Sequence, residues 1–190
     1  MKIVFATNNS HKLSEVKAVL GESFELVTLK EVGITEDIPE IGETLDDNAS
    51  IKARYVYERT GLDCFADDTG LEVEALDGAP GVRSARYATD GHDFAANNRK
   101  LLSELEGKTN RNARFRTVIS LIVDGKESKV EGIVRGTIAT QESGSEGFGY
   151  DPLFIPEGKS VTFADMTADE KNAISHRGRA VAELVKALKK

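Results

Sequence analysis

The chain has 190 residues, one cysteine and a formal net charge of -7. This length suits one domain or two closely fused lobes and buries enough apolar surface to fold without a disulfide or a structural metal. The negative charge argues against nucleic acid and acidic membranes as partners, and the lone Cys64, with no signal-like or membrane-spanning segment, predicts a cytoplasmic setting.

The first half of the chain alternates between strand and helix patterns. A buried strand is predicted over residues 2–6, followed by a helix that ends at Gly21. A second helix is predicted over residues 44–59 and a short strand over 64–66. We expect this second strand to end in the polar segment Asp-Asp-Thr-Gly that follows it.

The second half contains longer strands. Apolar residues at helical spacing predict a helix over residues 94–105, and two long strands are predicted over 114–123 and 130–138. The Asp124-Gly125 turn between them indicates a hairpin, and a last apolar stripe over 181–188 indicates a C-terminal helix. Without a linker, the sequence predicts one α/β domain over residues 1–190, with a long mixed sheet and flanking helices.

The first predicted strand leads into a loop of small polar residues. The N–H groups and the macrodipole at the start of the following helix suit a phosphate group, and Lys12 could add a positive charge to the same anion. The alternative is that the Asn and Ser side chains are ordinary helix caps and that Lys12 is solvated. The segment lacks the glycines of a P-loop or a dinucleotide-binding motif.

The segment Phe-Ala-Asp-Asp-Thr-Gly places two carboxylates at a strand end, where ligands of α/β proteins commonly bind. Adjacent residues of a strand point to opposite faces, so Asp67 and Asp68 cannot both enter one site if the strand continues through them. A turn closed by an aspartate is one alternative. An aspartic peptidase is another, but the single Asp-Thr-Gly copy would require a dimer and would leave the polar loop without a role.

Two later segments add aromatic and cationic side chains. In Gly-Phe-Gly-Tyr-Asp-Pro, Phe148 and Tyr150 flank a glycine and could form a platform for a planar base, although a turn with a core phenylalanine is the simpler alternative. In Ile-Ser-His-Arg-Gly, His176 and Arg177 lie where a helix starts, and cations there oppose the dipole. With nearby Lys171, they hint at an anionic or carbonyl-bearing ligand.

Together, the segments TNNSHK, ADDTGLEVEALDGAPGVRSARY, GFGYDPLF and EKNAISHRG resemble the inosine triphosphate pyrophosphatase family. The resemblance runs from Thr7 to Arg177. It implies a mixed α/β fold with two lobes around a cleft, usually a homodimer. It also implies Mg²⁺-dependent cleavage of ITP, dITP or XTP to monophosphate and pyrophosphate.

The resemblance also implies roles for individual residues. Asp68 matches the proton acceptor and, with Glu40, the metal ligands, while Lys52 matches a phosphate lysine and Thr69 touches substrate. Threonine stands at position 69 where serine is commoner, which keeps the hydroxyl. The remaining matching residues fall into a phosphate group, Thr7, Asn8, Asn9, Ser10, His11 and Lys12, and a base and sugar group, Phe148, Gly149, Tyr150, Asp151, Lys171, His176 and Arg177.

The chemistry of these residues agrees with that assignment. Two carboxylates supply the oxygen ligands that Mg²⁺ prefers, and a water that attacks phosphorus needs a base and cations near the leaving group. A non-catalytic nucleotide sensor would use the same residues but release no product, whereas a nucleic-acid-binding module would need a broad basic face. An assay of phosphate release separates these classes.

Overall fold

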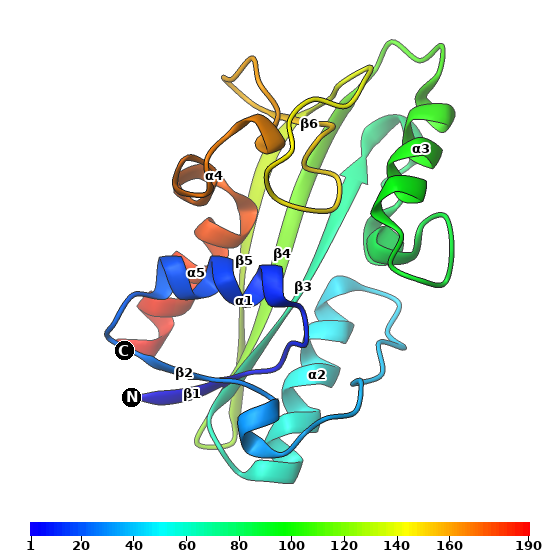
Figure 1. The fold of residues 1–190 in the computed structure, drawn as a ribbon. Helices are drawn as coiled ribbons and strands as arrows, with labels where there is room; N and C mark the ends of the chain where they lie inside the picture. The colour runs from blue at the N-terminus through cyan, green and yellow to red at the C-terminus, as the bar shows by residue number, and fades with distance from the viewer. The chain divides into compact units, whose positions relative to one another are not determined.

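The computed structural model describes residues 1–190 and contains one mixed six-stranded sheet with the order β2-β1-β3-β4-β5-β6 (Figure 1). Strand β1 is parallel to β2 and β3, whereas β5 and β6 are antiparallel. The predicted fold class, a mixed α/β sheet with flanking helices, is therefore confirmed. The strands are β1 Lys2–Phe5, β2 Glu25–Val27, β3 Cys64–Val73, β4 Asn112–Val123, β5 Lys126–Ile138 and β6 Phe154–Pro156.

The helices begin where their capping residues predict. Thr44 accepts the Asp47 N–H at the start of α2, and Asp93 accepts the Ala96 N–H at the start of α3. At the other end of α2, Gly61 adopts a left-handed conformation at φ 66°. The helices are α1 Ser10–Leu20, α2 Leu45–Thr60, α3 Phe94–Leu105, α4 Ala168–Ile174 and α5 His176–Leu188. No helix combines the length and apolar character needed to cross a membrane.

Two predicted strand boundaries are wrong, since β5 begins at Lys126 instead of at residue 130, and β3 ends later than expected. Strand β3 does not end at Ala66 but continues through the Asp-Asp-Thr-Gly segment to Val73, which also rules out the turn closed by an aspartate. The two aspartates are buried in the strand, at 1% and 7% exposure, because each lies beside cationic side chains. Sequence propensity, which disfavours aspartate in strands, is overridden by these ion pairs.

The chain divides into two compact units. Unit 1 comprises residues 1–68, 117–132 and 177–190, and unit 2 comprises residues 69–116 and 133–176. Within unit 1, alternate residues of β3 face different helices. Phe65 packs in a cluster with α1 and α5, whereas Cys64 and Ala66 pack in a cluster with α2.

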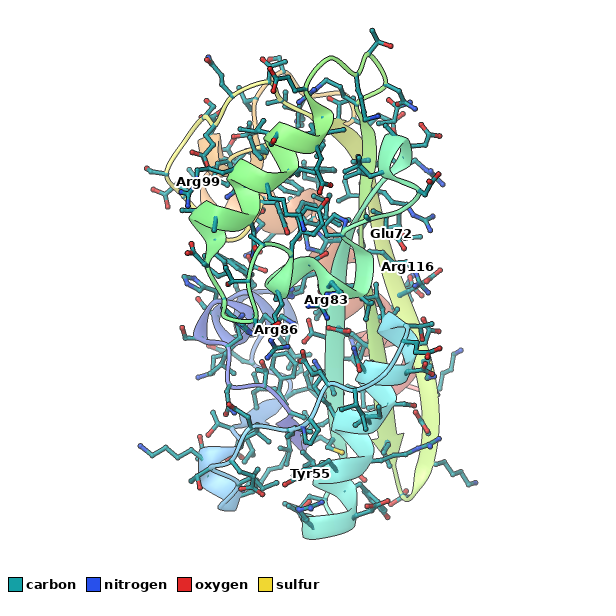
Figure 2. All side chains as sticks on the ribbon, turned by 90° about the vertical axis from the view of Figure 1, so that its right-hand side faces the viewer. Tyr55, Glu72, Arg83, Arg86, Arg99 and Arg116 are labelled. Carbon is teal, nitrogen blue, oxygen red and sulfur yellow. The ribbon has the colours of Figure 1, made fainter.

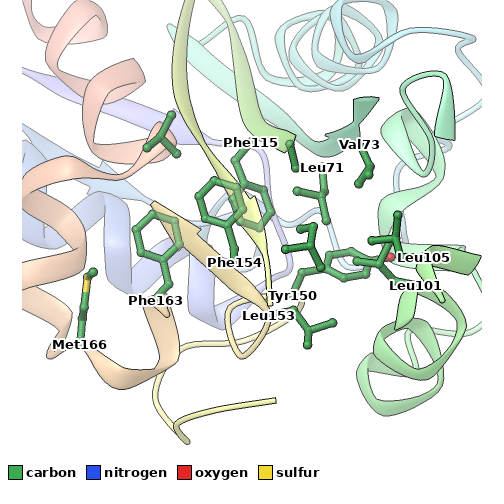
Figure 3. Close-up of a cluster of buried hydrophobic side chains, with 13 residues drawn as sticks. Leu71, Val73, Leu101, Leu105, Phe115, Tyr150, Leu153, Phe154, Phe163 and Met166 are labelled. Carbon is green, nitrogen blue, oxygen red and sulfur yellow. The ribbon is translucent and has the colours of Figure 1, made fainter. Parts of the chain in front are cut away.

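The core of unit 2 is rich in aromatic rings (Figure 3). Phe115 of β4 has ring-centroid distances of 4.6 Å to Phe154 and 6.1 Å to Phe163. Leu101 and Leu105 of α3 complete the same cluster. Such rings bury large apolar areas, so this cluster fixes β4, β6 and α3 as one rigid support.

Candidate functional site

Asp67 and Asp68 lie on opposite faces of β3, because the strand continues through both. Asp67 shares the face of Phe65 and contacts Lys12 at the start of α1, with 3.3 Å between Nζ and Oδ1. Asp68 shares the face of Ala66 and lies near Lys52 of α2, with 3.9 Å between Nζ and Oδ1. One strand therefore carries two ion clusters in unit 1, one on each face, and their charges act on each other.

The first ion cluster contains Lys12, Glu15, Asp67 and Arg177. Arg177 donates from Nε to Asp67 Oδ2 at 3.3 Å and from Nη1 to Glu15. The Arg177 and Asp67 side chains are 2% and 1% exposed, whereas Lys12 keeps 15%. Because the guanidinium is held at two of its nitrogens, its plane is fixed.

The pKa values of Asp67 and Lys12 are both lowered in this cluster, with different consequences for the two side chains. Burial raises the pKa of Asp67, but Lys12, Arg177 and Lys52 outweigh it and hold that pKa well below its usual range. Burial lowers the pKa of Lys12, and the attraction of Asp67 only partly offsets the effect. Asp67 is therefore ionised at neutral pH, and the partly exposed Lys12 is the member that can reach a ligand.

The second ion cluster contains Glu40, Lys52 and Asp68. Lys52 Nζ lies 3.1 Å from Glu40 Oε1 and 3.9 Å from Asp68 Oδ1. Burial raises the pKa of Asp68. Lys52 and Lys12 lower this pKa, whereas the charges of Glu40 and Asp67 raise it further, and the net effect is a raised pKa. For Lys52, burial lowers the pKa, but the carboxylates outweigh it and leave the pKa raised. Asp68 is thus a buried carboxylate whose proton affinity is increased.

The loop that carries Glu40 is anchored at three points. Tyr55 of α2, labelled in Figure 2, donates its hydroxyl to Glu36 at 2.6 Å. Asn48 of α2 accepts the Gly42 N–H at 2.7 Å, and Asn8 contacts Asp37 at 3.3 Å. These contacts hold the Glu40 carboxylate near Asp68. The sequence analysis did not identify Tyr55 or Asn48 as residues that support the site.

The donor chemistry of the second cluster fits a hard divalent cation. Glu40 and Asp68 are carboxylates that approach the same ammonium group, and the charge of Glu40 contributes to the raised pKa of Asp68. The chain gathers no set of three or more His, Cys, Asp or Glu side chains suited to a metal. Two carboxylates are the usual protein share for Mg²⁺, which takes its other oxygens from phosphate and water.

The polar loop before α1 is partly a helix cap. Asn9 Oδ1 accepts the N–H groups of His11 and Lys12, at 3.0 and 3.2 Å, and Thr7 Oγ1 accepts the Asn9 N–H. The alternative considered for asparagine is therefore correct for Asn9, and two N–H groups expected to meet phosphate already have a partner. The Lys12 ammonium remains the main cation that this loop directs toward an anion.

In unit 2, the predicted base-side residues surround Asp151. Asp151 Oδ2 accepts Lys171 Nζ at 2.6 Å and the Phe148 N–H at 3.1 Å, and Lys171 Nζ lies 4.9 Å from the centre of the Phe148 ring. Gly147 is required here, since a Cβ at that position would lie 2.1 Å from Asp151 Oδ2. Asp151 thus orders the loop and the lysine.

The two aromatic residues of this loop have different surroundings. Tyr150 is 5% exposed, belongs to the core cluster and donates its hydroxyl to the Ser84 carbonyl at 2.6 Å. Phe148 is only half-buried, so of the two rings it offers the accessible surface. Asn98 of α3, which sequence reasoning missed, donates from Nδ2 to the Gly149 carbonyl at 2.9 Å.

The last two predicted residues fall in different units. His176 is 3% exposed and stacks on Phe115 of unit 2, with 4.5 Å between ring centres and 19° between planes. Arg177 belongs to the first ion cluster of unit 1. Thr69 is half-buried in β3 and belongs to unit 2. The phosphate and metal candidates therefore all lie in unit 1, and the base-side candidates lie in unit 2 except for Arg177.

Comparison with known proteins gives a single result over the whole chain. The sequence pattern of the Ham1 family matches residues 3–187. A dITP/XTP pyrophosphatase of Porphyromonas gingivalis is 56% identical, with 96% of this chain and 95% of that protein aligned. The corresponding protein of Bacillus subtilis is 46% identical, with 97% and 96% aligned.

Solved structures agree with the sequence relatives. The Ham1 protein of Staphylococcus aureus superposes with a TM-score of 0.90 at 36% identity, covering 100% of this chain and 98% of that one. A HAM1 protein from Coxiella burnetii gives a TM-score of 0.91 at 39% identity, with the same coverage. The likeness therefore extends to the complete fold.

Proposed function

The chain belongs to the Ham1 family, and from this membership we propose that it is a dITP/XTP pyrophosphatase that hydrolyses non-canonical purine nucleoside triphosphates. The family resemblance inferred from the four sequence segments is confirmed. Products would be the nucleoside monophosphate and pyrophosphate, which removes deaminated purines from the nucleotide pool. The observation that carries the proposal is the buried Asp68, with its raised pKa, beside Lys52 and Glu40.

Asp68 is the proposed general base. A carboxylate accepts a proton from attacking water more readily when its pKa lies closer to the working pH, and burial moves the pKa of Asp68 in that direction. Lys12 and Lys52 would stabilise the charge that develops on the phosphate oxygens. No covalent nucleophile is needed, and burial raises the pKa of Cys64 to about 12, which keeps it an unreactive thiol.

Mg²⁺ is the proposed cofactor, held by Glu40 and Asp68. When bound, it would neutralise phosphate charge and polarise the phosphoryl group. Lys52, whose Nζ lies 3.1 Å from Glu40 Oε1 and 3.9 Å from Asp68 Oδ1, would bind a phosphate oxygen. The phosphate group of the proposal comprises Thr7, Asn8, Asn9, Ser10, His11, Lys12 and Lys52, and Thr69 is proposed to touch the substrate.

The base is proposed to be read by Phe148, Lys171, His176 and Arg177. A 6-oxopurine offers an acceptor at O6, which cationic donors favour, whereas adenine offers a donor there. The ordered guanidinium of Arg177 and the fixed Lys171 support this assignment, because rigid donors discriminate better than mobile ones. Gly149, Tyr150 and Asp151 would shape the loop.

The products of a short reaction test the proposal. Purified protein with Mg²⁺ and ITP should give inosine monophosphate and pyrophosphate at the earliest time point, as separated by ion-exchange chromatography. Diphosphate with orthophosphate would indicate a different hydrolase. Binding without turnover would favour the alternative of a nucleotide sensor.

We also propose a homodimer in the cytoplasm, as the resemblance implies. Light scattering should then give twice the 20.6 kDa mass of one chain. A monomer at micromolar concentration would contradict this part of the proposal without affecting the activity.

A further inference from the structure

The groups proposed for phosphate binding and hydrolysis come from unit 1. Lys12, Lys52, Glu40 and Asp68 belong to it, as does Arg177 through its pairing with Asp67. The aromatic and base-side residues around Asp151 belong to unit 2. Except for Arg177, the residues proposed to recognise the purine base therefore come from other parts of the chain than the residues proposed to cleave the phosphoanhydride.

From this division we propose a second activity, the hydrolysis of inorganic tripolyphosphate to orthophosphate and pyrophosphate at the same site. The inference rests on the proposed function, because it uses the same general base, Asp68, and the same cations, Lys12 and Lys52. It goes beyond that function in requiring no nucleoside in the substrate.

The charges of the two ion clusters suit such a substrate. Tripolyphosphate has no ester group, so it carries at least as much negative charge as a nucleoside triphosphate. Lys12 retains 15% exposure and is held by Asp67 through one carboxylate oxygen, and Lys52 is held beside Glu40 and Asp68. Both ammonium groups are therefore ordered before an anion arrives, which lowers the cost of binding it.

The reaction balances without further components. One water oxygen forms a bond to phosphorus, one phosphoanhydride bond breaks, and the bridging oxygen leaves with the departing phosphate. Asp68 accepts a proton from the water and later returns it to solvent or product. Because tripolyphosphate is symmetric, attack at either end gives the same two products, so no group needs to set its direction.

Tripolyphosphate lacks the purine base of ITP, so it lacks the binding interactions that a nucleotide makes far from the reacting phosphorus. Such binding contributes to substrate affinity and to positioning, so its loss should raise KM and lower kcat to a smaller extent. We expect kcat/KM for tripolyphosphate to be about 10²- to 10⁴-fold below that for ITP.

The test compares tripolyphosphate and ITP with the same purified protein and Mg²⁺, following both products by ion chromatography. Asp68→Asn should lose both activities, which excludes a contaminating phosphatase. Lys12→Met should weaken both, whereas Lys17→Met, on the exposed side of the same helix, should change neither. ITP should inhibit tripolyphosphate cleavage with an inhibition constant equal to its KM.

A binding measurement gives an independent result. Calorimetry with Asp68→Asn should detect tripolyphosphate binding that excess ITP prevents. Cleavage of ITP with no cleavage of tripolyphosphate above the Asp68→Asn background overturns this inference and leaves the proposed function intact. Failure to cleave either substrate overturns both, and tripolyphosphate cleavage that ITP does not inhibit overturns the shared site.

Discussion

Asp68 is the residue on which the proposed chemistry depends most directly. Because burial raises its pKa in the folded protein, ionising the Asp68 carboxyl costs stability as the pH rises above the pKa it has in the unfolded chain. Asp68→Asn should therefore lower kcat for ITP by several orders of magnitude while the melting temperature stays equal or rises. Activity and thermal melting of the same preparation check both parts. Near-normal turnover would contradict its role as the base.

Asp67 should behave in the opposite way. Asp67→Asn leaves Lys12 and Arg177 buried beside a neutral group, which should destabilise the protein by about 3–5 kcal/mol at pH 7. The folded pKa of Asp67 is depressed, so its contribution is present above the unfolded pKa and is lost as pH falls through the folded value. Urea titrations from pH 7 to 2 should show a difference that is constant down to about pH 4, near the ordinary pKa of an aspartate, and that shrinks at lower pH. A difference that is constant over the whole range would mean that charge pairing is not its cause.

Arg177 decides whether the first ion cluster also reads the base. Arg177→Ala should lower kcat/KM for ITP by about 10²-fold or more, and for ATP far less, because a charged hydrogen bond to O6 is lost. Phe148→Ala, which removes a stacking surface, should weaken both nucleotides alike. Equal losses for ITP and ATP in Arg177→Ala would make Arg177 a structural partner of Asp67 and Glu15 only.

Helix α3 supports the loop over residues 147–151. Asn98 of α3 is only 3% exposed, and it donates a hydrogen bond to the Gly149 carbonyl. Asn98→Ala and Asn98→Asp both remove this donor, so each should raise KM for ITP about tenfold, the effect of losing roughly 1.4 kcal/mol, with kcat less affected. Steady-state kinetics with ITP measure the change in KM separately from the change in kcat.

Leu105→Ala is the matched control for that prediction. Leu105 lies two turns further along α3 in the apolar core and has no contact of this kind with the loop. It should lower the melting temperature without changing KM. Equal KM changes in the Leu105 and Asn98 variants would show that helix stability, rather than the hydrogen bond, sets the affinity.

Sequence periodicity predicted most elements but not the details of β3. The hairpin of β4 and β5, and helices α2, α3 and α5, follow from apolar spacing and capping residues. The continuation of β3 through two aspartates could not be predicted, because it depends on lysines and an arginine from distant segments. Asn98 did leave a signal, as it is a polar residue on the apolar stripe of α3.

At the scale of the whole molecule, the two units could not be found by searching for linkers. The chain passes between them four times, at residues 68–69, 116–117, 132–133 and 176–177. Three of these passages occur inside β3, β4 and β5, and the fourth occurs at the start of α5. Since regular elements cross each boundary, no Gly-, Pro- or Ser-rich segment marks it. The family resemblance supplied the expectation of two lobes that composition could not.

Because neighbouring side chains of β3 face opposite sides of the sheet, substitutions at positions 67 and 68 should affect the cell in different ways. Most substitutions at position 67 should reduce the amount of protein, because Lys12 and Arg177 would each lose a carboxylate partner, which favours unfolding and degradation. Substitutions at position 68 by small neutral residues should leave the amount unchanged and remove its protection of the nucleotide pool. In a mutational survey that scores abundance and activity separately, two adjacent columns would then show two distinct routes to the same loss of function.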